Sequence, residues 1–123
     1  MPLPSVKSLQ VIAAEKAATG KAQREADYAK FLVEATKAKT KLRCELTAKI
    51  EAKILAAPGA GEAEVYAFSP TNTDDYQRTL AYTRVWREVI AAWAVTQKRK
   101  GYTVTTRTFG LTTLIVKVTW PRS

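Results

Sequence analysis

The chain has 123 residues, which is enough for one domain with a modest core. Its 46% hydrophobic and 25% charged residues are typical of a folded globular protein and exclude a disordered chain. Twenty Lys and Arg against eleven Asp and Glu give a net charge of +9, spread evenly: residues 1–57 carry eleven basic and six acidic side chains, and residues 58–123 carry nine and five. An even spread suits solubility, an acidic partner or nucleic acid, and argues against a dedicated basic arm.

The residues that most often carry catalysis are scarce. The chain has no histidine and one cysteine, Cys44, so it lacks the commonest general base, the usual zinc sites and any internal disulfide. Cys44 lies within an expected helix without a partner base, which favours a structural thiol over a reactive one. We therefore expect a protein that is not an enzyme and that takes no metal, cofactor or small-molecule substrate.

The N-terminal residues 1–5 lack the apolar core of a signal peptide, and no apolar run approaches the roughly 20 residues of a membrane span. We expect no membrane association. The expected location is the cytoplasm, or a virion that is assembled there.

Residues 6–57 contain no proline and are rich in alanine, lysine, glutamate and leucine, which favours a long helix. Gly20 is the weak point, because glycine costs about 1 kcal/mol relative to alanine inside a helix. We expect either a kink near Gly20 or two helices, over residues 6–19 and 21–57.

An apolar stripe with spacings of three and four runs along the second part of this helix. Its members are Phe31, Ala35, Ala38, Leu42, Leu46, Ile50 and Ile54. A helix of about 37 residues would be roughly 55 Å long, whereas the 66 remaining residues form a globule with a radius of gyration of only about 11 Å. We therefore expect part of the stripe to meet another copy of the chain or a different protein, with Phe31, Ala35, Leu42, Leu46, Ile50 and Ile54 as the interface.

Residues 58–61, Pro-Gly-Ala-Gly, end the long helix and form a linker. A short strand is expected over residues 64–68, and β-branched residues around Gly110 predict a hairpin over residues 102–120. The domain organisation expected is a helical segment over 1–57, the linker over 58–61 and a small α+β head over 62–123.

Between the strand and the hairpin, residues 76–100 form a strongly apolar helix. Asn72 or Thr73 caps its start, Asp74 and Asp75 suit its positive end, and Gly101 takes the left-handed position at its finish. Capping accounts for the two aspartates more simply than a metal or acid–base site does. Large aromatic side chains follow the helical spacing at Tyr82, Trp86 and Trp93, and core packing is favoured over a surface for stacking nucleic-acid bases.

A second candidate surface is basic. Five cations near the end of this helix and on the hairpin can contact nucleic acid or an acidic partner: Lys98, Arg99, Lys100, Arg107 and Lys117. A solvated helix end and an outward strand face are the simpler alternative.

The fold class expected is α+β, with a long N-terminal helix followed by a strand–helix–hairpin head. The expected function is that of a structural subunit that packs into a larger homo- or hetero-oligomeric complex. A phage-type virion component, such as a capsid accessory, neck or tail protein, is one such setting. The alternative is a basic nucleic-acid-binding protein.

Overall fold

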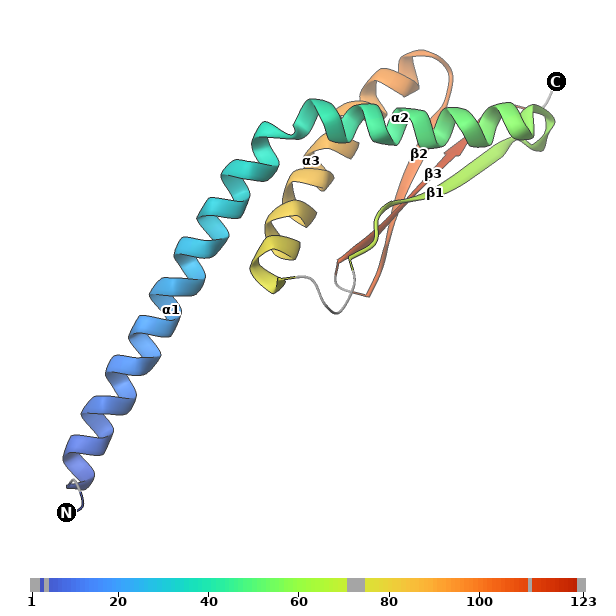
Figure 1. The fold of residues 1–123 in the computed structure, drawn as a ribbon. Coiled ribbons are helices and arrows are strands. Elements are labelled where there is room, and N and C mark those ends of the chain that lie inside the picture. Colours follow the sequence, from blue (N-terminus) through green and yellow to red (C-terminus); the bar gives the residue numbers. More distant parts are fainter. Residues whose placement is uncertain (1–2, 4, 71–74, 111, 122–123) are drawn as a thin grey trace.

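The computed structural model describes residues 3, 5–70, 75–110 and 112–121. Its elements are α1 (Val6–Lys37), α2 (Lys39–Ala56), the short 3-10 helix η1 (Pro58–Ala60), β1 (Glu62–Phe68), α3 (Tyr76–Arg99), β2 (Thr103–Phe109) and β3 (Thr113–Thr119). The order confirms the α+β fold with a long N-terminal helix that the sequence predicts. Figure 1 shows α2, α3 and the strands gathered into one body, from which α1 extends.

The long helix changes direction at Ala38, not at Gly20, so the expected kink near Gly20 is wrong. Ala38 has φ −87° and ψ 0°, and its N–H donates to the carbonyls of both Glu34 and Ala35. Gly20 stays helical because it lies where α1 packs against nothing that would bend it. At Ala38 the chain passes from packing on α3 to packing on β1 and α3 together, and the two directions differ (Figure 1).

The three strands form an antiparallel sheet in the order β1-β3-β2. β2 and β3 make the expected hairpin, and Gly110 has the positive φ, 66°, that such a turn requires. β1 pairs with the other side of β3, with a register irregularity between Tyr66 and Phe68. β3 is therefore central, and β1 and β2 are the two edges.

Side chains at both ends of α3 explain where it starts and stops. Asp75 caps the start, and its carboxylate accepts from the N–H groups of Gln77 and Arg78 at 2.9 and 3.1 Å. The other expected capping residues, 72–74, lie outside the described residues. Gly101 has φ 96° after the last turn, as expected for a left-handed cap.

The core lies between the inner face of the sheet and the helices α2 and α3. β1 and β3 alternate, so that Ala63, Val65, Ala67, Leu114, Val116 and Val118 point inward and are buried. Trp86 and Trp93 of α3 pack in the same cluster as Leu42, Leu46 and Ile50 of α2. Residues 35–54 thus share one core with residues 63–118.

No described helix covers the outer face of the sheet (Figure 1). Ion pairs cross it: Arg107 reaches Glu64 and Lys117 reaches Glu62, each at 3.0 Å. Ile115 is nevertheless buried in the middle of this face. Its register neighbours Tyr66 and Arg107 lie on either side of it, so side chains supply the cover that a helix would otherwise give.

Candidate functional site

The apolar stripe expected to be an interface lies largely inside the chain. Ala35, Leu42, Leu46 and Ile50 are buried in the core, and Ile54 packs against it. Phe31 is half-buried where α1 meets α3. Because the break at Ala38 lets the head cover both helices in turn, the stripe serves the chain's own fold. Ala35, Leu42, Leu46 and Ile50 therefore belong to the chain's own core, and Phe31 and Ile54 stay half-buried at its border.

The five candidate cations separate into two groups. Arg107 and Lys117 lie on the outer face of the sheet and are ion-paired with Glu64 and Glu62. Lys98, Arg99 and Lys100 lie exposed at the end of α3, and none of the three is ion-paired with a residue that the structure describes. The fold therefore does not gather all five into one unpaired patch.

The aromatic stripe of α3 is core. Tyr82, Trp86 and Trp93 are all buried members of the core cluster, so packing accounts for their helical spacing. Trp93 donates its indole N–H to Thr47 Oγ1 of α2 at 3.1 Å. Tyr82 donates its hydroxyl to Glu34 of α1 at 3.0 Å, and burial, together with this carboxylate, raises the pKa of Tyr82. These two hydrogen bonds join α3 to α1 and α2.

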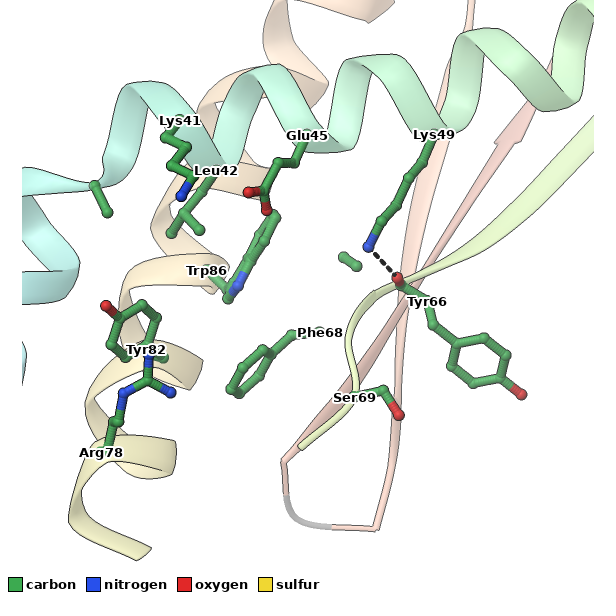
Figure 2. Close-up of a pocket in the computed structure, with 12 residues that line it drawn as sticks. Lys41, Leu42, Glu45, Lys49, Tyr66, Phe68, Ser69, Arg78, Tyr82 and Trp86 are labelled. Atoms are coloured by element: carbon green, nitrogen blue, oxygen red, sulfur yellow. Dashed lines mark hydrogen bonds between the residues drawn. The ribbon is translucent and has the colours of Figure 1, made fainter. Parts of the chain in front are cut away.

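A cavity of about 450 Å³ opens between α2, the end of β1 and the first half of α3 (Figure 2). Trp86, Tyr82 and Phe68 form its aromatic side, and the ring centroids of Phe68 and Tyr82 are 6.4 Å apart. The guanidinium of Arg78 lies 4.4 Å from the centre of the Tyr82 ring, a cation–π contact. Lys49 donates to the carbonyl of Tyr66 at 3.2 Å.

The charged groups around this cavity are three cations and one carboxylate, from Lys41, Lys49, Arg78 and Glu45. Two carboxylates with opposed roles, or a nucleophile beside a base, are the arrangements that acid–base or covalent catalysis uses. The described lining holds neither arrangement. Its excess positive charge favours an anion, but Lys49 is already hydrogen-bonded to Tyr66 and Glu45 opposes a negative ligand.

The largest uncovered element is the N-terminal half of α1. From residue 6 to residue 26 every side chain is exposed except for half-buried Gly20. These 21 residues would extend for about 32 Å, and Figure 1 shows them leaving the body of the molecule. Val6, Leu9 and Ile12 share one side of this segment at spacings of three, and they are 72, 50 and 43% exposed. We call residues 6–26 the projecting segment.

The sequence analysis does not single out the projecting segment, although residues 6–12 carry an apolar pattern with helical spacing. The stripe from Phe31 to Ile54 has larger side chains and a longer unbroken run, so it is the stronger of the two apolar patterns. The spacing of Val6, Leu9 and Ile12 is helical too, but lysines and alanines interrupt it further along. Only the fold shows which of the two apolar runs is covered.

Cys44 is exposed, and the part of the chain that the structure describes holds no cluster of three metal-ligating side chains. No described helix has the length and apolar character needed to cross a membrane. Comparisons with protein-family models, curated proteins and solved structures found no match.

Proposed function

We propose that this chain is a non-enzymatic structural subunit that packs into a larger assembly through the projecting segment of α1. The single observation that carries the proposal is the exposure of the projecting segment, residues 6–26 of α1, with Val6, Leu9 and Ile12 on it. The partner is another copy of the chain or a second subunit of the same complex. A neck, tail or capsid-accessory position in a phage-type virion suits such a subunit.

The energetics of isolated helices support a partner for the projecting segment. Helices shorter than about 12–15 residues are marginal in water, and longer ones gain most of their stability from packing an apolar face. Val6, Leu9 and Ile12 gain nothing while they are solvated. Burial of three such side chains would contribute about 1.5–3 kcal/mol each. A partner that covers this side therefore stabilises both the helix and the complex.

The same helix face runs from the body into the projecting segment. In the body, Ala35, Phe31 and Tyr28 mark the side of α1 that turns towards α3. Counting back along the chain in steps of three and four leads to Arg24, Gly20, Ala17, Ala13, Leu9 and Val6. A partner that packs on this face beyond Arg24 thus continues the surface that α3 already covers, and Ala13 and Ala17 allow close approach.

Light scattering on the purified chain at moderate and high salt tests the proposal. We expect a discrete oligomer that persists at about 1 M salt, where the Debye length is near 3 Å, because apolar burial holds it. Leu9→Asp with Ile12→Asp should lower the mass. Ala18→Asp with Ala22→Asp, which adds two charges at exposed positions on the opposite side of α1, should leave it unchanged.

Hydrogen exchange on the same samples locates the contact. In the wild-type oligomer the amides of residues 6–26 should exchange slowly, and in the Leu9→Asp, Ile12→Asp chain they should exchange rapidly while the core stays protected. Equal masses and equal exchange for the two chains would contradict assembly of the chain with itself through α1.

Nucleic-acid binding is the second candidate, and Lys98, Arg99 and Lys100 favour it. They form an exposed basic cluster at the C-terminal end of α3 on a chain with a net charge of +9. Phosphate contacts by such a cluster give affinity without sequence preference. Titration of the chain with duplex DNA at moderate salt tests this candidate, and undetectable binding would dismiss it.

A further inference from the structure

The two edge strands of the sheet, β1 and β2, differ in how well they are protected against pairing with another strand. At the β1 edge, α2 lies alongside, Lys49 donates to the carbonyl of Tyr66 at 3.2 Å, and the register slips between Tyr66 and Phe68. Such bulges and overlying groups are how proteins protect a strand edge. At the β2 edge, six of the seven residues are exposed, and only Val104 is half-buried. β2 therefore leaves backbone groups open to another strand.

The sequence of β2 also lacks the usual deterrents to strand pairing. It reads Thr-Val-Thr-Thr-Arg-Thr-Phe, without proline, lysine or an acidic residue. Its one charge, Arg107, bonds to Glu64 at 3.0 Å across the outer face of the sheet. The guanidinium is thereby held over β3, towards the opposite edge. The rest is β-branched or aromatic, the composition that favours strands.

We propose that β2 pairs antiparallel with β2 of a second copy, joining two sheets into one of six strands. Two-fold symmetry about Thr106 brings all seven residues into register: Thr106 faces Thr106 of the partner, Val104 faces Thr108, Thr105 faces Arg107, and Thr103 faces Phe109. No two like charges stand opposite each other in this register. Centring the pair one step along, on Arg107, would place two arginines face to face, which is unfavourable.

A shallow apolar cavity beside β2 lies where the partner strand would cover it. Its volume is about 280 Å³, and it is lined by Ala94, Val95, Lys98, Tyr102, Thr103 and Val104. Val95 is 55% exposed there, on the helix-covered side of the sheet. In the proposed register the partner's Thr108 lies opposite Val104, at the border of this cavity. Phe109, which is 72% exposed on the outer face, would lie against the partner's Thr103.

This contact would close the assembly instead of propagating it. A two-fold axis between the β2 strands relates two copies and leaves no free β2 edge for a third copy. The ends of the joined sheet would then be two β1 strands, which α2, Lys49 and the register irregularity already protect. The inference does not depend on the projecting segment, because β2 and residues 6–26 are different surfaces.

The test introduces a charge at Thr106, because in the proposed register this residue lies opposite Thr106 of the second copy. Thr106→Lys would place two lysines in opposition, so we expect self-association at least tenfold weaker than in the parent chain with Leu9→Asp and Ile12→Asp alone, by sedimentation equilibrium. Thr106→Glu should behave likewise, and an equimolar mixture of the two variants should recover a species of twice 13.6 kDa. Thr40→Lys, which adds the same charge on an exposed residue of α2, is the control.

All of these chains carry Leu9→Asp and Ile12→Asp, so that the α1 contact is absent and the β2 contact is read alone. Circular dichroism confirms that each variant is folded, and Thr108→Lys replaces Thr106→Lys if that chain is not. Monomers for the parent chain at all concentrations would overturn the proposal. So would a dimer that Thr106→Lys leaves intact, or a variant mixture that fails to associate.

Discussion

Two glycines of this chain show how differently one residue type can be used. Gly101 has φ 96°, a region that side chains with a Cβ enter only with strain, and it lets the chain leave α3 and enter β2. Gly20 has ordinary helical geometry within α1, where glycine supplies nothing that the helix needs. A Cβ at Gly20 would meet only Arg24 Nη1, at 3.4 Å, the end of a flexible side chain.

Alanine substitution should therefore have opposite effects at the two sites. Gly101→Ala should lower the free energy of unfolding by about 1–2 kcal/mol, because the left-handed conformation is unfavourable with a Cβ. Gly20→Ala should raise helix content by favouring the helical state by up to about 1 kcal/mol. Urea unfolding followed by circular dichroism measures both. A stability loss at Gly20 would mean that something packs closely against α1 there.

For single residues, the sequence predicted correctly those conformations that depend on the local chain. Gly101 and Gly110 adopt positive φ as their turn signals predict, and Asp75 lies at the start of α3. The identity of the capping residue was harder, because Asn72, Thr73, Asp74 and Asp75 all have suitable side chains. Which of four adjacent acceptors caps a helix depends on the path of the chain before it, and that path is set by tertiary packing.

At the scale of elements, α1 and α2 differ in what they contribute to stability. α2 buries Leu42, Leu46 and Ile50 in the core. The projecting segment of α1 buries none of its side chains within the chain. Two leucines with the same chemistry, Leu46 and Leu9, are 0 and 50% exposed. They form a matched pair for measuring the difference.

Leu46→Ala should lower the free energy of unfolding by about 2–5 kcal/mol, since it leaves a cavity in a packed core. Leu9→Ala should change it by less than about 0.5 kcal/mol in the dissociated chain, as expected for a surface site. Urea titration at low protein concentration, with light scattering to confirm dissociation, gives both values. Equal losses would mean that the projecting segment folds back onto the body in solution.

The elements were predictable in kind and order, but the break between α1 and α2 was not. Propensity points to Gly20 as the weak position, whereas Ala38, at which the helix breaks, has the best propensity of all residues. The break arises because residues on its two sides pack against different surfaces. The residues near Ala38 in the sequence do not indicate which surfaces the two helices pack against.

For the molecule as a whole, the net charge and the positions of the ion pairs lead to different predictions about nucleic-acid binding. A charge of +9 suggests a broad affinity for nucleic acid. In the structure, however, Arg107 and Lys117 are ion-paired, and Lys39 is paired with Glu88 at 3.0 Å, which lowers the pKa of Glu88. The exposed cluster at the end of α3 then contributes three cations, Lys98, Arg99 and Lys100. Any binding by that cluster should therefore release few counterions.

If DNA binding occurs at the end of α3, log K should fall with log salt with a slope of about −2.7, from about 0.9 for each of three phosphate contacts. Neutralising Lys98, Arg99 and Lys100 to glutamine should flatten that slope. Neutralising Arg107 and Lys117 should change it by less. Fluorescence anisotropy across a salt series measures the slope, and a value several times steeper would place the nucleic acid on another face.

The location of the exposed apolar surface could not be predicted from the sequence. Length arithmetic correctly indicated that a small head cannot cover so long a helix, but it could not say which end remains bare. Phe31 to Ile54 supplies the larger side chains, and the head takes that part for its core. The surface left over is the less apolar one, as expected because burial of the more hydrophobic run stabilises the fold more.

Because α1 continues unbroken through Gly20, the direction in which Val6, Leu9 and Ile12 point relative to α3 depends on the number of residues in the projecting segment. Each residue turns an α-helix by about 100° and advances it by about 1.5 Å. One alanine inserted after Glu25 would swing Val6, Leu9 and Ile12 about 100° out of phase with α3 and uncouple them from a partner fixed to the body. Seven inserted residues would restore the phase to within about 20°, with these three side chains carried about 10 Å farther out.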